Sequence, residues 1–140
     1  MVASKRTQLD FGEKSLEYYQ HLKRELGGLP GRDLTNRELF LIAMAWGYHN
    51  EMRVEEFKHS ATGVRLEYLK DEDYAIMAAI QYATTEDTET LLDMEQRLTI
   101  AEQYAEGGIL LLAQMMDEPG EFARSFAADI KELAGLLKIG

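Results

Sequence analysis

The chain has 140 residues, no cysteine and a formal net charge of −10. This length is close to the commonest size of one domain, so we expect a single helical domain over residues 1–140. The lack of cysteine excludes disulfides and thiolate metal sites. No apolar run approaches the roughly 20 residues that span a bilayer, and the N-terminus lacks the apolar stretch of a signal peptide. We therefore expect a cytoplasmic protein without membrane contact.

The first part of the chain predicts two helices. Residues 11–26 carry apolar side chains three or four positions apart, which is typical of one helical face, and a glycine-rich stretch ends them. Thr35 and Glu38 match a capping box, in which a hydroxyl and a carboxylate three residues later satisfy the first backbone N–H groups of a helix. The residues from Leu39 to Trp46 are apolar on all sides, so we expect a buried central helix that ends near Gly47.

Residues 48–69 lose the helical period. Gly63 and the alternation of Val64, Leu66 and Tyr68 favour an extended loop or a short strand. A third helix is expected over residues 71–84, because three acidic residues suit the positive end of a helix dipole and a wide apolar surface follows them.

The remainder of the chain also predicts helices. After a short turn at residues 88–92, residues 94–116 are typical of a long helix with a double glycine inside it, and residues 121–137 of a last helix. Glycine inside a helix costs roughly 1 kcal/mol relative to alanine, so close helix contact or a break must offset the pair. The pattern predicts an all-α fold, a compact bundle of about five helices with one irregular or short-strand segment near 48–69.

Charge is divided unevenly along the chain. Residues 1–70 hold 11 Lys/Arg against 10 Asp/Glu, a net of +1, whereas residues 71–140 hold 4 against 15, a net of −11. The acidic half would repel nucleic acid phosphates and attract a basic protein surface, since complementary potentials steer association. We therefore expect a protein partner with a basic surface. The alternative is that the acidity serves solubility or reflects a salty cytoplasm.

The most basic and aromatic stretch is the irregular segment after the central helix. Arg53, Lys58, His59 and Arg65 lie there among aromatic side chains, a combination that contacts phosphates and stacks on bases. Glutamates in the same segment oppose this positive field. Contact of these four residues with DNA or with a partner is therefore one interpretation, and an ordinary surface loop is the other.

No catalytic motif stands out. The sequence has no G-x-S-x-G, P-loop or Rossmann glycine pattern, so we predict no catalytic residue, no cofactor and no metal. The one Glu-x-x-His, at Glu56 and His59, falls short of the two such motifs of helical di-iron bundles. Glu102 and Glu106 lie one helical turn apart and could bind a cation or act in acid–base chemistry, although solvated glutamates are commoner. A small metal-dependent hydrolase built on these residues is the least favoured hypothesis.

The double glycine has two interpretations. Tyr104, Glu106, Gly107 and Gly108 either contact a neighbouring helix or form a site for a partner. The apolar residues from Leu110 to Met116 predict a homodimer if one face of them is exposed.

Two stretches together resemble a known family. One runs from Glu38 to Tyr48, Glu-Leu-Phe-Leu-Ile-Ala-Met-Ala-Trp-Gly-Tyr, and is followed by Arg53; the other runs from Glu102 to Ile109, Glu-Gln-Tyr-Ala-Glu-Gly-Gly-Ile. Between them lies Asp-Glu-Asp-Tyr-Ala-Ile and an alanine-rich helix. Over residues 35–112, their order and spacing resemble the small helical proteins called Dnd system-associated protein 4. These proteins are encoded beside the DNA phosphorothioation and restriction genes of bacteria and archaea, so the resemblance implies a role in that system. It implies no catalytic residues for this chain.

The leading hypothesis is a non-enzymatic accessory protein of a DNA phosphorothioation- or restriction-type defence system. It would act through protein–protein contacts of an acidic helical surface. A direct nucleic-acid-binding module that uses residues 48–69 is the alternative hypothesis.

Overall fold

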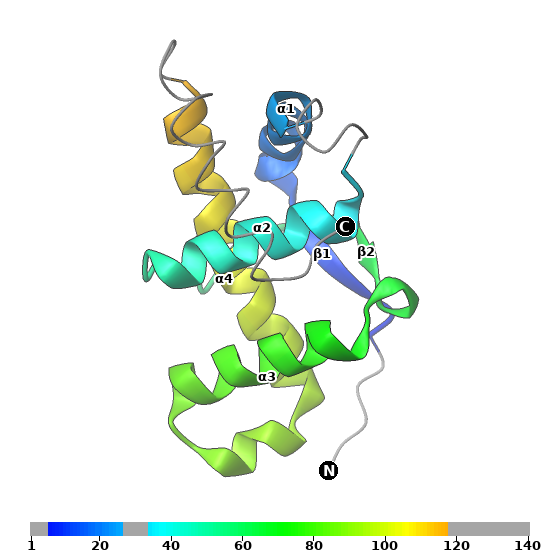
Figure 1. The fold of residues 1–140 in the computed structure, drawn as a ribbon, viewed down its shortest axis with the longest axis vertical. Coiled ribbons are helices and arrows are strands. Elements are labelled where there is room, and N and C mark those ends of the chain that lie inside the picture. The colour runs from blue at the N-terminus through cyan, green and yellow to red at the C-terminus, as the bar shows by residue number, and fades with distance from the viewer. Residues whose placement is uncertain (1–5, 27–33, 118–140) are drawn as a thin grey trace.

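The structure, a computed structural model, describes residues 6–26 and 34–117. In these residues the chain is mostly helical, with four α-helices and one two-stranded antiparallel sheet (Figure 1). In chain order the elements are β1 (Gln8–Gly12), α1 (Leu16–Leu26), α2 (Asn36–His49), β2 (His59–Arg65), α3 (Asp71–Thr85) and α4 (Met94–Met116). Three short 3₁₀ helices are η1 (Glu13–Ser15), η2 (Leu66–Tyr68) and η3 (Thr88–Leu92).

The core is centred where α2 crosses α4 (Figure 1). The predicted capping box begins α2: the Thr35 hydroxyl accepts from the N–H of Glu38 at 3.2 Å, and the Glu38 carboxylate accepts from the N–H of Thr35 at 2.9 Å. Residues 39–45 are all buried, as their unbroken apolar run predicts. A helix without a polar face is stable only where other elements surround it.

Small residues bring the backbones of α2 and α4 into direct contact. A Cβ atom added to Gly108 would lie 1.7 Å from the carbonyl oxygen of Ala43, and one added to Gly47 would lie 2.0 Å from that of Tyr104. Helix α4 runs through the double glycine without a break, over 23 residues. The close contact therefore offsets the low helix propensity of glycine.

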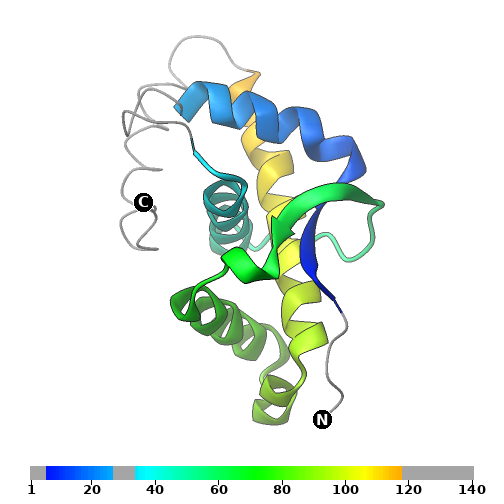
Figure 2. The ribbon, with the colours of Figure 1, turned by 90° about the vertical axis from the view of Figure 1, so that its right-hand side faces the viewer.

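Strands β1 and β2 pair antiparallel and lie along α4 (Figure 2). Leu9 and Phe11 of β1 are buried in the core. The register changes partway along the pair. Asp10 lies opposite Gly63 and Gly12 lies opposite His59, so β2 uses more residues than β1 between these two positions. This bulge on β2 shifts His59 toward Asp10, and bulges commonly redirect a side chain in this way.

The structure corrects several sequence-based expectations. The helix predicted over residues 11–26 begins only at Leu16, because Phe11 belongs to β1 and stacks from there on Tyr19, with ring centroids 4.0 Å apart. The chain is mostly helical, as predicted, and β2 lies in the predicted short-strand segment near 48–69, but the class is not all-α because β1 pairs with β2 in a sheet. The described residues form four α-helices, against about five expected for the whole chain. Helix α2 also continues past Gly47 to His49.

The helix predicted over residues 121–137 lies outside the described residues. None of the helices in the described part of the chain is long and apolar enough to cross a membrane.

Candidate functional site

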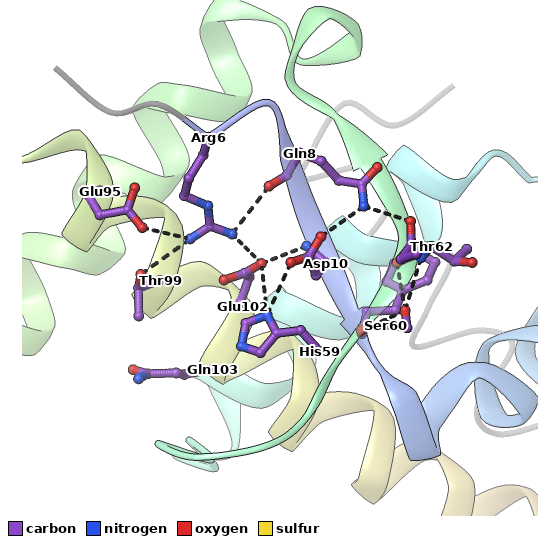
Figure 3. A network of polar contacts seen from close by, with 12 residues as sticks. Arg6, Gln8, Asp10, His59, Ser60, Thr62, Glu95, Thr99, Glu102 and Gln103 are labelled. Atoms are coloured by element: carbon purple, nitrogen blue, oxygen red, sulfur yellow. Dashed lines mark hydrogen bonds and ion pairs between the residues drawn. The ribbon is translucent and has the colours of Figure 1, made fainter.

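A polar network lies where β1, β2 and α4 meet (Figure 3). At its centre is Glu102 of α4, whose side chain is 1% exposed. Its Oε2 atom forms an ion pair with Arg6 and accepts a hydrogen bond from the backbone N–H of Asp10 at 2.6 Å. Strand β1 pairs with another strand on one side only. The Glu102 carboxylate therefore accepts a hydrogen bond from a backbone N–H group on the unpaired edge of β1. Arg6 also donates to Glu95, Thr99 and the carbonyl oxygen of Gln8.

His59 enters the network from β2. Its Nδ1 atom lies 3.3 Å from Oδ2 of Asp10 and 3.8 Å from Oε2 of Glu102. The imidazole stacks on the ring of Phe57 with centroids 4.5 Å apart, and the His59 side chain is 43% exposed. A buried carboxylate, a half-buried carboxylate and a solvent-accessible imidazole therefore share one small site.

Burial dominates the electrostatics of Glu102. Removal from water raises the pKa of its carboxyl group, while the hydrogen bonds from Asp10 and Arg6 act in the opposite direction. Its second oxygen, Oε1, is buried and has no hydrogen-bond partner, which holds for no other buried side-chain polar atom among the described residues. Because buried polar atoms are nearly always paired, this oxygen has spare capacity for a ligand.

A second buried carboxyl group lies one turn further along α4. Glu106 is 7% exposed, and both of its carboxyl oxygens contact the hydroxyl of Ser15, at 2.8 and 2.9 Å. Burial raises the pKa of Glu106, and the Ser15 hydrogen bond and the charge of His59 lower it by less. The pKa of the fully buried Tyr19 is raised for the same reason and by the nearby charge of Glu106.

The structure separates the four residues predicted to contact nucleic acid or a partner. Arg53 donates to Gln103 Oε1 at 2.7 Å, Lys58 pairs with Glu13 at 3.5 Å and Arg65 pairs with Glu67 at 2.7 Å. His59 and Arg65 stand at opposite ends of β2, opposite Gly12 and Gln8 of β1. At 3.3 Å per residue of β1, this is a separation of about 13 Å. The four side chains therefore do not form one basic patch.

The residues around the double glycine contact neighbouring elements. The Tyr104 hydroxyl lies 3.0 Å from that of Thr84, and a Cβ atom on Gly107 would lie 1.9 Å from the carbonyl oxygen of Met52. Further along α4, Met116 is buried in the core, so it offers no surface for a second copy of the chain. Self-association through Leu110 to Met116 stays a prediction.

Sequence reasoning missed two members of the network, Arg6 and Asp10. It paired His59 with Glu56, which is exposed, whereas the group of close potential metal ligands in the described residues is Asp10, His59 and Glu102. One signal was available: residues 8–11 alternate between polar and apolar, which is the period of a strand and places Asp10 opposite the core.

A second candidate surface surrounds η3, at the end of the molecule away from α1 (Figure 1). Its exposed carboxylates, which we call the acidic edge, are Glu86, Asp87, Glu89, Asp93 and Glu95. Two large apolar side chains are exposed among them, Tyr82 at 46% and Leu92 at 67%. Arg97 donates hydrogen bonds to Gln81 Oε1 at 3.0 Å and to the carbonyl oxygen of Leu91 at 2.7 Å.

Hydrogen bonds hold the acidic edge in one conformation. Gln81 is completely buried beneath it, and its Nε2 atom lies 2.6 Å from the carbonyl oxygen of Thr90 and 3.1 Å from that of Asp93. The Asp87 carboxylate accepts from the N–H of Glu89 at 2.9 Å, which caps η3. A surface held in this way loses little conformational entropy when a partner binds.

Comparison with known proteins adds one finding. The sequence model of the family described as DNA sulphur modification system-associated protein 4 matches residues 18–131. The chain belongs to this family. Its role is thus associated with a DNA sulphur modification system, and the resemblance of residues 35–112 to Dnd-associated proteins is confirmed. No curated protein and no solved structure matches the chain.

The family match begins at residue 18, inside α1, and includes the rest of α1, helices α2 to α4 and the acidic edge, whereas β1 lies before it. His59 and Glu102 therefore lie inside the matched residues, whereas Arg6 and Asp10 lie before them.

Proposed function

We propose that this member of the DNA sulphur modification system-associated protein 4 family is a non-enzymatic accessory protein that docks a basic partner protein through its acidic edge. The observation that carries the proposal is the combination of the exposed carboxylates around η3 with the exposed Leu92 of η3 and Tyr82 of α3. Interfaces commonly have this anatomy, in which a few apolar or aromatic anchors are surrounded by a charged rim.

The charges define the chemistry of the partner. In the described residues from 71 to 117, Arg97 is the one Lys or Arg, and it is bonded within the fold. From elsewhere in the chain, Arg6 pairs with Glu95 and Arg53 lines a hollow with Asp93 and Glu95, so carboxylates still outnumber cations at this edge. A predominantly acidic surface steers a basic partner and loses this effect when salt screens it. The partner surface is therefore rich in Lys and Arg and has an apolar recess for Leu92.

Local strain at the edge supports a functional role. Glu86 caps the C-terminus of α3 with a φ of 55°, in the left-handed region that favours glycine. It also places a negative charge at the negative end of the helix dipole. Glu86 is therefore unfavourable for the helix both in its backbone conformation and in its charge. Its presence there supports a role for this carboxylate on the surface.

Charge reversal at the acidic edge tests the proposal. Glu86→Lys with Glu89→Lys leaves the capping carboxylates of Asp87 and Asp93 intact. We expect this double variant to lose copurification with the sulphur-modification proteins of the same host. At low salt, its affinity for the captured protein should fall by about tenfold or more, since complementary charges govern association.

The matched control is Glu17→Lys with Glu25→Lys, which makes the same change in net charge at exposed positions on α1, at the opposite end of the molecule from η3 (Figure 1). It should bind like the unmodified chain, and high salt should weaken both. Equal binding by the two double variants, or capture of none of the modification proteins at low salt, would contradict the docking proposal.

Direct contact with nucleic acid is a second candidate, and one observation favours it. A groove of about 650 Å³ between β2 and the start of α2 is lined by Arg65, Lys70 and Tyr68, and Tyr68 is 60% exposed. An exposed aromatic ring beside two cations suits stacking on a base next to its phosphate.

A gel-shift assay with ordinary and phosphorothioate DNA tests the groove. If it binds, Tyr68→Ala should weaken the complex by about 1–3 kcal/mol, the usual contribution of one stacked base, and Arg24→Ala on α1 should not. Absence of a shift with either DNA at micromolar protein would exclude this candidate.

A further inference from the structure

We propose that Asp10, His59 and Glu102 bind one divalent transition-metal ion of the zinc class. The three residues come from β1, β2 and α4, and each offers a ligand atom within 4.8 Å of the other two (Figure 3). The proposal rests on this juxtaposition and is independent of the docking role of the acidic edge.

The spacing of the ligand atoms fits a small ion. With metal–ligand bonds of about 2.0–2.1 Å, neighbouring ligands of a tetrahedral zinc lie about 3.3–3.4 Å apart. The Nδ1 atom of His59 lies 3.3 Å from Oδ2 of Asp10 and 3.8 Å from Oε2 of Glu102. Small rotations of exposed or half-buried side chains would therefore bring the three atoms around one ion.

The ligand types select the class of metal. One imidazole and two carboxylates suit Zn²⁺ and its neighbours, whereas Mg²⁺ and Ca²⁺ prefer an all-oxygen shell. Three protein ligands leave a fourth position open to water. His59 is 43% exposed, so ion and water can reach the site from solvent.

The orphaned oxygen of Glu102 is the independent observation that points to a ligand. Oε2 already contacts Arg6 and the N–H of Asp10, whereas Oε1 is buried without any hydrogen-bond partner. The last torsion of a glutamate is soft, so a rotation presents Oε1 or Oε2 to the ion. The contact with Arg6 then orients the carboxylate as outer-shell partners of metal ligands do.

Surrounding residues are compatible with a bound cation. Phe57 stacks on the imidazole and holds the orientation of the ring. Arg6 is the cation next to the site, and its charge is shared with Glu95 as well as with Glu102. The ligand set contributes two carboxylates, those of Asp10 and Glu102, against the one positive charge of Arg6.

The test measures metal binding by the full chain after treatment with EDTA and dialysis. Titration calorimetry with Zn²⁺ should give one ion per chain, and Zn²⁺ should raise the thermal midpoint while Mg²⁺ at the same concentration should not. His59→Ala should weaken Zn²⁺ binding by more than about tenfold, since even outer-shell partners contribute about 10- to 100-fold. Asp10→Asn should do the same.

His49→Ala is the matched control, because His49 is exposed on α2 and lies outside the ligand group. Its affinity for Zn²⁺ should equal that of the unmodified chain. The proposal is overturned if the unmodified chain binds no Zn²⁺, or if His59→Ala and Asp10→Asn, folded by circular dichroism, bind it as well as His49→Ala does.

Discussion

Replacing Gly108 by alanine is expected to destabilise the protein by roughly 2 kcal/mol or more. The added Cβ atom would lie 1.7 Å from the carbonyl oxygen of Ala43 and 2.7 Å from the amide nitrogen of Gly47. Both are backbone atoms, which cannot rotate out of the way, so α2 and α4 must move apart at their crossing point in the core. Overpacking a core costs about 1–3 kcal/mol or more, and here it outweighs the gain of about 1 kcal/mol in helix propensity.

Equilibrium unfolding in urea measures this effect: the urea concentration at the unfolding midpoint should fall, while the dependence of the unfolding free energy on urea stays unchanged. The control is Gln114→Ala on the exposed side of the same helix, where a change within about 0.5 kcal/mol is expected. If Gly108→Ala proves as stable as the unmodified chain, the helices do not cross in backbone contact.

Replacing Glu106 by glutamine is expected to stabilise the protein at neutral pH. A serine hydroxyl has one hydrogen, so Ser15 can donate to only one of the two carboxyl oxygens that lie 2.8 and 2.9 Å from it. Both contacts are satisfied when the carboxyl group is protonated and donates in return. A glutamine amide reproduces this pair, because its N–H donates to Ser15 and its oxygen accepts, and it removes the cost of ionising a buried carboxyl group.

The same change should alter the dependence of stability on pH. The ordinary pKa of glutamate is 4.5, and burial raises that of Glu106 above it in the folded state. The folded protein then holds a proton that the unfolded chain has released. Glu106 therefore contributes stability that is complete below pH 4.5 and is lost as the pH rises through the raised pKa.

Unfolding free energies of the two proteins across this range test the prediction. Glu106→Gln should show a smaller decline with rising pH, and the part that remains is due to Glu102, whose pKa is also raised by burial. Glu17→Gln, at an exposed position on α1, is the control and should keep the original profile. A profile of Glu106→Gln parallel to that of the unmodified chain would show that Glu106 titrates normally.

Local sequence predicted the helices whose signals lie within the helix itself. The expected ranges 71–84 and 94–116 agree with α3 (Asp71–Thr85) and α4 (Met94–Met116), and the short turn at 88–92 is η3. The first helix was predicted to start too early, at Phe11 rather than Leu16. Phe11 fits both the 3.6-residue period of a helix and the two-residue period of a strand, and so short a stretch does not distinguish the two. Only pairing with β2 assigns it to a strand.

The candidate site was much less predictable. His59 and Glu102 were named from sequence, but with the wrong neighbours, since Asp10 is 49 positions from His59 along the chain. Their meeting depends on the bulge in β2 and on the packing of β1 against α4. Neither feature has a local sequence signal, because each results from contacts between segments distant in the chain.

The sequence by itself determined the acidic charge of the second half, the buried character of residues 39–45 and the capping box at Thr35. These follow from composition, from an apolar run without a polar face and from a hydrogen-bond pattern within one helical turn. Tertiary structure alone decided that Gly108 serves a helix crossing and that Glu102 is buried beside Arg6. A residue's burial and its partners depend on the elements packed against it, and residue type and spacing do not specify them.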